Sequence, residues 1–506
     1  MKMEYNKNKD SPGLCTEISE EGFFLTNILF AASECVPFVK TGGLADVVGA
    51  LPKSLDSSRF DVRVIIPYYT CIPARFRNFF HYRHHFYMDY ADRQEHVGIM
   101  EYEFDGIKFY FVDNEYYFNG ATPYGSDLKW DIERFTFFCK AVLAMMPVIG
   151  FHPDIIHCHD WQTGLIPVLM HSTFATHPFY QGVKSIMTIH NLRFQGVWDI
   201  KTFQKNTSLP DYMFTPDKLE FKKDANMLKG GLVYADYITT VSETYAEEIK
   251  TAQYGEQLEG LLYARRASLR GIVNGIDYDV YNPQTDNKIF AQYGIDDVLA
   301  GKAENKRRLQ EELGLPQDPH KMVIGIISRL TDQKGLNLLG AVFERFIDEH
   351  TQFVVIGTGD PGYENMFRYF AGRYPDRVSA NICYNDALAH KLYAGADMML
   401  VPSLFEPCGL TQLISLRYGS IPLVRETGGL KDTVQPYNEF ELTGTGFTFG
   451  PFHSEDFLHA VNYAKSVFFN YRENWDAMVR RGMEQDFSWG SSALQYQGMY
   501  EWLLGK

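Results

Sequence analysis

The stretch TNILFAASECVPFVKTGGLADVVGALP covers residues 26–52 and indicates how the chain folds. It begins with a nearly continuous apolar run, as expected of a strand buried on both faces of a parallel sheet. A pair of glycines then stands beside Lys40 and directly before a run with helical character. The stretch ETGGLKDTV, at residues 426–434, repeats the glycine pair with Glu426 in place of the lysine. Together they predict one related turn in each half of the chain.

Short apolar segments recur along the chain, and helical stretches separate them. This alternation predicts an α/β protein with doubly wound sheets. We expect strands at residues 27–33, 61–67, 108–114, 153–159, 184–190, 235–242, 321–330, 351–359, 396–403, 420–426 and 446–450.

The length of 506 residues exceeds one ordinary hydrophobic core, so we expect two large domains. A segment rich in Gly, Asn, Asp and Pro at residues 269–283 marks the boundary between them. The last stretch, SALQYQGMYEWLLGK, has the pattern of an amphipathic terminal helix.

Composition and charge exclude several classes of protein. The formal net charge of −15 argues against a nucleic-acid binder, which would carry a basic domain or stripe. No apolar run approaches the roughly 20 residues that span a bilayer, and the N-terminus lacks the apolar core of a secretory signal. The seven scattered cysteines show no CxxC spacing, which suits a reducing compartment. We therefore expect a cytoplasmic protein without membrane or nucleic-acid partners.

Polar clusters follow four of the predicted strands. In open α/β sheets, ligands bind at the carboxyl ends of the strands, so these clusters predict a cleft between two domains. In SRLTDQKG, Arg329 and Lys334 suit a diphosphate, because Arg offers a planar fork and Lys a compact charge. For this pair taken alone, solvated surface charges remain the alternative.

The cluster EPCGLTQL places Glu406 just before a turn and a predicted helix start. The backbone amides of Gly409, Leu410 and Thr411 would be free to bind an anion there. A carboxylate beside an anion site is electrostatically unfavourable unless it contacts hydroxyls or a developing positive charge. An ordinary helix-capping role for Glu406 is the alternative.

Three further patterns suggest metal or dinucleotide binding, and we interpret each of them otherwise. His157 and His159 lie on one face of a strand but lack further ligands at metal-binding spacing. Asp277 and Asp279 form an acid-x-acid pattern within a Gly/Asn/Pro-rich linker, which favours turn chemistry. The sequence GTGDPG at residues 357–362 fits a dinucleotide fingerprint but follows the second strand of its domain and contains a proline, so we read it as a strand–helix turn.

A set of longer motifs identifies a family. In order, the chain carries KTGGLADVVGALP, HDWQTGL, TIHNLRFQG, VSETYAEEI, VNGID, KAENKRRLQ, SRLTDQKGL, VPSLFEPCGLTQL and LVRETGGLKDTV. These motifs resemble those of bacterial glycogen synthases and plant starch synthases that use ADP-glucose, and the resemblance covers residues 26–503.

The resemblance implies a GT-B fold, in which two Rossmann-like domains face each other across a deep cleft. It implies a retaining α-1,4-glucosyltransferase that needs no metal or other cofactor, with ADP-glucose and an α-1,4-glucan as partners. We assign residues 1–25 to an N-terminal extension that can be disordered. The domains are then residues 26–275 and 276–485, and residues 486–506 form a helix that packs back on the first domain.

Roles for individual residues follow from the same resemblance. The residues acting on the reacting sugar and its leaving group would be His190, Arg329, Lys334 and Glu406. The donor site would add Lys40, Gly42, Gly43, Asn274, Tyr384, Cys408, Gly409, Leu410 and Thr411. The acceptor glucan would approach Glu34, Asp46, Asp160, Trp161 and Asn191.

The chemistry implied is substitution with ADP as leaving group, passing through an oxocarbenium-like carbon. Fixed cations would stabilise the charge that develops on the diphosphate. No second acid pairs with Glu406, since Ile414 stands where many relatives of this fold carry a glutamate. We therefore favour attack from the same face, with the departing phosphate taking the acceptor proton. A non-catalytic glucan-binding protein and a UDP-glucose-dependent enzyme remain the alternatives.

Overall fold

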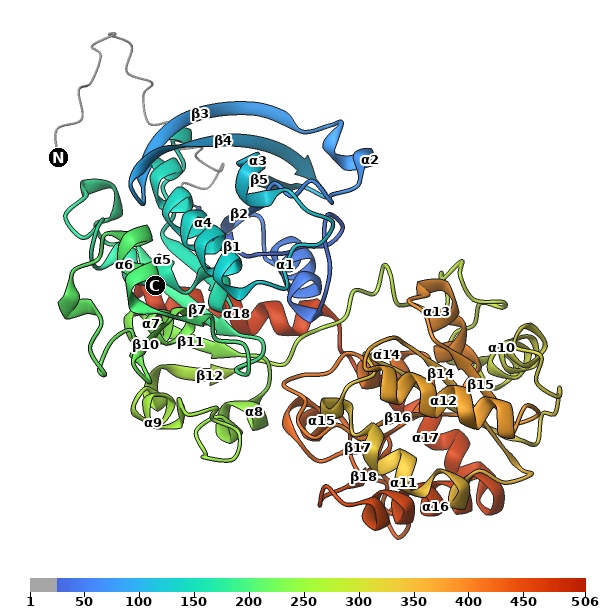
Figure 1. Cartoon of the computed structure of the whole chain (residues 1–506). Coiled ribbons are helices and arrows are strands. Elements are labelled where there is room, and N and C mark those ends of the chain that lie inside the picture. Colours follow the sequence, from blue (N-terminus) through green and yellow to red (C-terminus); the bar gives the residue numbers. More distant parts are fainter. Residues whose placement is uncertain (1–24) are drawn as a thin grey trace.

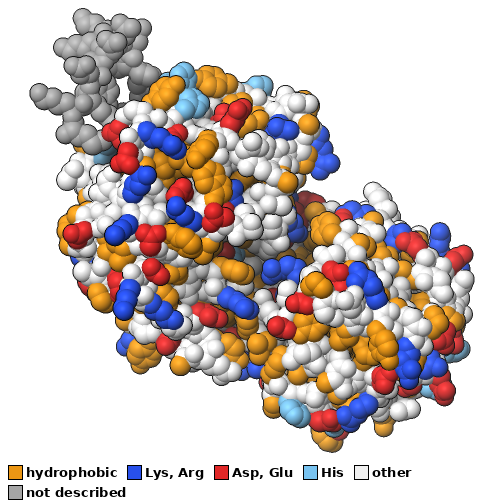
Figure 2. All heavy atoms as spheres, in the orientation of Figure 1, with side chains coloured by type: hydrophobic (Ala, Val, Ile, Leu, Met, Phe, Trp, Pro, Cys, Tyr) orange, Lys and Arg blue, Asp and Glu red, His pale blue; other side chains and the backbone are white. Residues whose placement is uncertain are grey.

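Two β-sheets, each with its own hydrophobic core, organise the computed structural model of the chain (Figure 1). The structure describes residues 25–506, so nearly all of the assigned N-terminal extension lies outside the described residues. In the space-filling view, the surface is hollowed between the two domains (Figure 2). Among residues 25–506, no helix combines the length and apolar character that crossing a membrane would require.

The N-terminal domain is built on a nine-stranded sheet with the strand order β12-β11-β7-β6-β1-β2-β5-β4-β3. Its strands are β1 (Thr26–Ala31), β2 (Phe60–Pro67), β3 (His81–Tyr90), β4 (Arg93–Phe104), β5 (Ile107–Asp113), β6 (Ile155–His159), β7 (Lys184–Ile189), β11 (Tyr237–Thr240) and β12 (Leu269–Gly271). The pairs β3–β4 and β4–β5 are antiparallel, and the other pairs of this sheet are parallel. A small separate sheet contains β8 (Val197–Trp198), β9 (Glu220–Phe221) and β10 (Asp224–Asn226).

Helices follow most of the parallel strands of this domain. They are α1 (Gly43–Ser54), α2 (Ala74–Arg77), α3 (Glu115–Phe118), α4 (Leu128–Ile149), α5 (Leu165–Met170), α6 (Ile200–Thr207), α7 (Met227–Tyr234), α8 (Glu243–Glu248) and α9 (Glu259–Ala264). Short 3₁₀ helices are η1 (Trp161–Thr163), η2 (Pro178–Tyr180), η3 (Asp211–Met213) and η4 (Arg266–Ser268).

The C-terminal domain has a fully parallel six-stranded sheet with the order β15-β14-β13-β16-β17-β18. Its strands are β13 (Met322–Ile327), β14 (Thr351–Ile356), β15 (Val378–Asn381), β16 (Met398–Val401), β17 (Ile421–Arg425) and β18 (Phe447–Phe449). Its helices are α10 (Val298–Glu312), η5 (Asp332–Lys334), α11 (Leu336–Phe346), α12 (Pro361–Arg373), α13 (Asp386–Gly395), α14 (Thr411–Arg417), α15 (Gly428–Thr433), α16 (Ser454–Asn470) and α17 (Arg472–Glu484).

The predicted doubly wound α/β architecture is confirmed, and each predicted segment contains a strand. The long hairpin of β3 and β4 was not predicted. Its first strand, HYRHHFYMDY, is largely exposed and lacks the continuous apolar run of a buried parallel strand.

The chain crosses between the two cores twice, and the crossings lie side by side. The backbone N–H of Ile276 donates to the Phe487 carbonyl at 2.8 Å. A Cβ at Gly275 would lie 2.6 Å from the backbone nitrogen of Trp489, so only glycine allows this approach. From there the last helix, α18 (Trp489–Leu504), returns to the N-terminal core, where it is seen in red in Figure 1.

A buried ion pair anchors α10 to the C-terminal sheet. Lys306 Nζ lies 2.8 Å from Asp397 Oδ2, and both side chains are almost fully buried. The same carboxylate oxygen accepts a hydrogen bond from the backbone N–H of Val323 at 2.7 Å. The KAENKRRLQ motif therefore contributes a core interaction, although it lies on a helix of largely polar sequence.

Replacing Lys306 with Met should destabilise the protein by about 3 kcal/mol or more, because Asp397 would be left as an unpaired buried charge. Chemical unfolding at neutral pH measures this change. The neighbouring Arg307 provides a control, since its pairing with Glu304 is exposed and Arg307→Met should cost less than about 1 kcal/mol. Equal losses of stability in the two variants would contradict the interpretation of Lys306 and Asp397 as a stabilising buried pair.

Candidate active site

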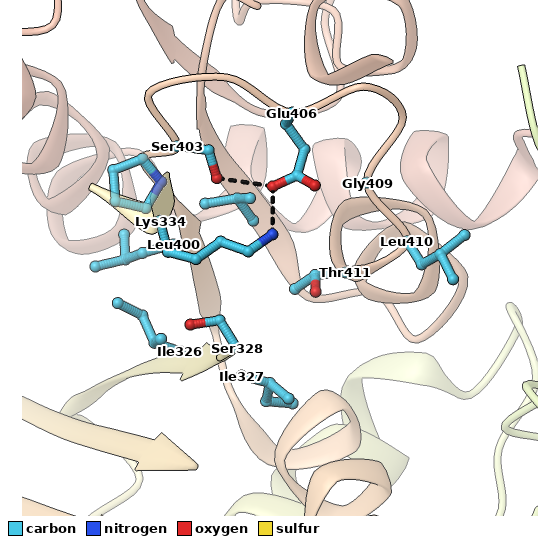
Figure 3. A pocket seen from close by; sticks show the side chains of 12 residues that line it. Ile326, Ile327, Ser328, Lys334, Leu400, Ser403, Glu406, Gly409, Leu410 and Thr411 are labelled. Carbon is cyan, nitrogen blue, oxygen red and sulfur yellow. Dashed lines mark hydrogen bonds and ion pairs between the residues drawn. The ribbon is translucent and has the colours of Figure 1, made fainter. Parts of the chain in front are cut away.

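A pocket opens at the carboxyl ends of β13 and β16, with Lys334 and Glu406 at its centre (Figure 3). Lys334 Nζ lies 2.6 Å from Glu406 Oε2, and Ser403 Oγ donates to the same oxygen at 2.8 Å. Both charged side chains are mostly buried. Because both of these contacts use Oε2, the other oxygen of Glu406 remains for a ligand.

Local backbone geometry brings Lys334 to this position. The short helix η5 ends at Lys334, and Gly335 follows with a φ of 70°. A Cβ on Gly335 would lie 1.9 Å from the carbonyl oxygen of Pro402. The glycine is therefore required for the loop after β13 to pack against the loop that carries Ser403 and Glu406.

Two hydroxyl groups in this pocket were not predicted from the sequence. Ser403 orients Glu406, as described above. Ser328 lines the pocket, and its buried Oγ has no hydrogen-bond partner among the described residues. Because buried hydroxyls are usually hydrogen-bonded, the unpaired Oγ marks Ser328 as a candidate contact for a ligand in this pocket. The only sequence signal was that each serine adjoins a predicted charged cluster.

The second glycine pair packs directly against the loop that follows Glu406. Gly428 has a φ of 46°, and a Cβ there would lie 2.0 Å from the Glu406 carbonyl oxygen. A Cβ on Gly429 would lie 2.3 Å from the Cys408 carbonyl oxygen, and the Gly429 N–H donates to Glu406 O at 3.2 Å. This glycine pair therefore holds the backbone of the loop from Glu406 to Cys408.

The first glycine pair has more space. A Cβ on Gly42 would lie 3.8 Å from Glu34 Oε1, and one on Gly43 would lie 3.9 Å from a methyl carbon of Leu410. Both are ordinary van der Waals distances, so of the two glycine pairs only the second is crowded against neighbouring backbone. The nearness of the Leu410 side chain to Gly43 also shows that the two domains approach each other at the site.

Acidic side chains surround the first turn. Lys40 Nζ lies 2.7 Å from Asp46 Oδ1. The Glu34 carboxylate accepts from the backbone N–H and the hydroxyl of Thr41, at 2.5 and 2.8 Å. Burial raises the pKa of both Glu34 and Asp46 above their usual range. Lys40 thus carries a charge that Asp46 already balances in this structure.

His190 and Asp160 lie together at the ends of β7 and β6. Asp160 Oδ1 accepts from the His190 backbone N–H at 2.7 Å, and His190 Nε2 lies 3.0 Å from His159 Nδ1. Burial lowers the pKa of His190 to about 3 and raises the pKa of Asp160 to about 7. At neutral pH, His190 is therefore an uncharged hydrogen-bonding group.

Other residues of the implied donor site differ in environment. Arg329 is exposed and its side chain has no hydrogen bond or ion pair to any residue within 25–506, and Tyr384 is 84% exposed. Asn274 is buried, and its Oδ1 has no partner in the described part of the chain. Cys408 is buried as well, and this raises the pKa of its thiol to about 12. Thr411 is the first residue of α14, and the N-cap residue Leu410 makes no side-chain hydrogen bond to the helix.

Two residues of the implied acceptor site are engaged in local contacts. Trp161 is almost fully buried, edge-on to Phe135, and a Cβ on Gly196 would lie 2.3 Å from its ring. Asn191 Oδ1 accepts from the backbone N–H of Arg193 at 3.1 Å.

The possible metal and dinucleotide patterns have structural explanations. His157 bonds to Tyr500 and Thr188 inside the core. Asp277 pairs with Lys53 at 2.8 Å and caps its own turn at Asp279. Within residues 25–506, no cluster of three or more His, Cys, Asp or Glu side chains could hold a metal ion. In GTGDPG, the glycines at residues 357 and 359 pack against the backbone of the loop after β13.

Similarity to known proteins extends over nearly the whole chain. Residues 27–264 match the family described as "Starch synthase catalytic domain", and residues 305–480 match "Glycosyl transferases group 1". The chain is 58% identical over 476 residues to a glycogen synthase of Lachnospira eligens, covering 94% of this chain and 99% of the relative. It is 54% identical to a glycogen synthase of Lachnoclostridium phytofermentans, covering 94% and 100%.

A solved structure extends the similarity to the fold. The catalytic domain of starch synthase IV from Arabidopsis thaliana, bound to ADP and acarbose, superposes with a TM-score of 0.85 at 33% identity. The match covers 95% of this chain and all of that chain. The predicted GT-B fold and the predicted family resemblance are both confirmed by these similarities.

The two glycine pairs should respond differently to alanine. Gly429→Ala should destabilise the protein by about 1–3 kcal/mol, because its Cβ would overlap the backbone of Cys408. Gly43→Ala should leave stability within about 1 kcal/mol of the wild type, since its Cβ fits and alanine favours helix. Thermal unfolding compares the two variants, and similar losses of stability in both would contradict the structural distinction.

Asp160 should make the stability of the protein depend on pH. Between about pH 4 and 7, the folded state retains a proton on Asp160 that the unfolded chain has released. The wild type should therefore lose stability relative to Asp160→Asn as the pH rises through this interval, by about 1 kcal/mol or more. Urea unfolding of both proteins at pH 5 and pH 8 tests this, and a constant difference would contradict it.

Proposed function

The chain belongs to the family of bacterial glycogen synthases and starch synthases, and from this we propose that it transfers glucose from ADP-glucose to an α-1,4-glucan. The glucose would join the non-reducing end with retention of configuration. The observation that carries the proposal is the pocket with Lys334 and Glu406, in a chain whose fold matches a starch synthase holding ADP and acarbose. ADP-glucose and the glucan would be its two partners.

Lys334 and Arg329 would stabilise the diphosphate as it leaves. Lys334 is fixed by its contact with Glu406, so its charge is preorganised next to the pocket. Arg329 is exposed on the same loop and is available to a ligand. The backbone amides of Gly409 to Thr411, at the pocket wall, would add further donors to the phosphate. These contacts would strengthen as negative charge moves onto the ADP.

Glu406 would bind the hydroxyls of the transferred glucose. Lys334 and Ser403 both contact Oε2, which leaves Oε1 for the sugar. The adjacent lysine would also offset the charge of this carboxylate beside a diphosphate, which supports placing Glu406 next to the donor phosphates.

His190 would act on the sugar as a neutral group. Its low pKa excludes a charged imidazolium at neutral pH, and His159 occupies its Nε2 side. Its other ring nitrogen would therefore contact a glucose hydroxyl. The role is one of orientation rather than proton transfer.

Retention would follow from attack on the same face as the departing phosphate. The bond between the anomeric carbon and the phosphate oxygen breaks, and a bond to the acceptor hydroxyl oxygen forms. The proton of that hydroxyl passes to the leaving phosphate oxygen. No metal is assigned a role, and Asp277, the candidate ligand in the linker, is already paired with Lys53.

We also propose that residues 26–275 and 276–485 move as two domains, with residues 486–506 returning to the first. The paired crossings at Gly275 and Phe487 would serve as the hinge. Closure would bring Lys40 and His190 towards the donor held by the second domain.

Release of ADP from ADP-glucose in the presence of glycogen, measured with EDTA present, tests the function. Lys334→Ala should lower kcat at least about 100-fold, because a preorganised charge next to the leaving group is lost. Arg345→Ala is the control, since Arg345 pairs with Glu455 on the surface. UDP-glucose serves as a second donor. Absence of transfer from ADP-glucose, or an unchanged kcat in Lys334→Ala, would contradict the proposal.

A further inference from the structure

The motif VSETYAEEI, residues 241–249, has no part in the site described so far, yet it contacts the other domain at three points. It forms the end of β11 and the short helix α8 in the N-terminal domain. Each of the three contacts reaches the C-terminal domain at the loop after β16 or at the turn and helix after β17. We call these two segments, residues 406–408 and 427–432, the catalytic loop and the TGG turn.

The first two contacts start from the beginning of α8. Ser242 Oγ accepts from the Tyr245 N–H at 3.1 Å, as a helix cap, and donates to the Pro407 carbonyl at 2.6 Å. Thr244 donates from its N–H and its hydroxyl to the Asp432 carboxylate, at 2.9 and 2.5 Å. One end of the helix is therefore bonded to the catalytic loop and, through Asp432, to the TGG turn.

The third contact is a partly buried carboxylate at the other end of α8. Glu248 Oε1 accepts from the Thr427 hydroxyl at 2.9 Å and from the Gly428 N–H at 3.1 Å. Thr427 is fully buried, and Glu248 Oε2 is buried with no partner among residues 25–506. Burial raises the pKa of Glu248. Desolvating a carboxylate is unfavourable, so contact between domains alone would be better served by an apolar side chain.

The Glu248 carboxylate makes directional hydrogen bonds, which an apolar side chain could not make. It fixes one backbone N–H and one hydroxyl of the TGG turn, and that turn is in backbone contact with the catalytic loop. The Gly429 N–H donates to the Glu406 carbonyl at 3.2 Å, while Ser242 holds the next carbonyl, that of Pro407. The catalytic loop is thus held by the TGG turn and by α8, and Glu248 fixes the TGG turn to α8.

We propose that Glu248 is a positioning residue for glucosyl transfer, which sets the catalytic loop, and with it Glu406, through its bonds to Thr427 and Gly428. This inference rests on the role of Glu406 given under the proposed function. It assigns to VSETYAEEI a mechanical link between the orientation of the two domains and the geometry of the site. Loss of the link should affect turnover more than acceptor binding.

Three variants test the inference. Glu248→Ala removes both bonds, and Glu248→Gln keeps an acceptor oxygen for both donors. Glu247→Ala is the matched control, because Glu247 is the adjacent helix residue and its side chain, which pairs with Lys250, is 75% exposed. We expect Glu248→Ala to lower kcat about 10- to 100-fold with little change in KM for glycogen. The kcat of Glu248→Gln should stay within about 5-fold of the wild-type value, and the kcat of Glu247→Ala should equal the wild-type value.

A second readout does not depend on activity. Cys408 belongs to the catalytic loop and is buried, whereas Cys383 is exposed. Peptide-resolved mass spectrometry can follow alkylation of each thiol separately. In Glu248→Ala, alkylation of Cys408 should accelerate about 10-fold or more, because the loop opens more often, while Cys383 reacts as before. If Glu248→Ala does not fold, Thr427→Val removes one of the two donors and should change both readouts in the same direction.

The outcomes separate the inference from the proposed function. Unchanged kcat and unchanged Cys408 alkylation in Glu248→Ala would overturn the inference, even if the melting temperature fell. A loss of activity that Glu248→Gln does not restore would overturn it as well. If the wild type itself failed to release ADP, the proposed function would fail, while faster Cys408 alkylation would still show that Glu248 holds the loop.

Discussion

The loops at the carboxyl ends of the C-terminal strands approach one another so closely that only glycine fits at their contacts. Gly357, after β14, lies against the Ser328 carbonyl, and Gly335, after β13, lies against that of Pro402. Gly428, after β17, lies against the carbonyl of Glu406, in the loop after β16. Each loop thus supports its neighbour, and Lys334 and Glu406 meet because their backbones are fixed in this way. The site is rigid where charge must be preorganised.

The two sides of the cleft provide different electrostatic environments. On the C-terminal side, Arg329 and Lys334 offer positive charge beside backbone amides, which suits an anionic donor. On the N-terminal side, burial raises the pKa values of Glu34, Asp46 and Asp160. Carboxyl groups with raised pKa values are suited to hydrogen bonding with neutral sugar hydroxyls. Positive charge on one side of the cleft and carboxyl groups with raised pKa values on the other match a reaction in which a charged donor transfers glucose to an uncharged polymer.

Much of the fold could be predicted from the sequence, because parallel strands buried on both faces leave continuous apolar runs. The hairpin of β3 and β4 could not, since His81–Tyr90 is mostly exposed and reads as polar sequence. For the site, the charged residues of short motifs were visible, but their partners were not. The pairing of Lys334 with Glu406 joins positions 72 residues apart, and the bond from Glu248 to Gly428 joins two domains. The resemblance placed Trp161 near the acceptor glucan, but no sequence signal indicated that its ring packs in the core beside Gly196.

The central claim is that one site, assembled by both domains around Lys334 and Glu406, holds the sugar nucleotide. A crystal structure of this chain with ADP and a short α-1,4-glucan tests it most directly. The account predicts that the terminal phosphate of ADP contacts Lys334 and Arg329, with the amide of Gly43 facing it across a closed cleft. A diphosphate bound outside this pocket, or one that leaves the pair of Lys334 and Glu406 without contact to the ligand, would contradict the account.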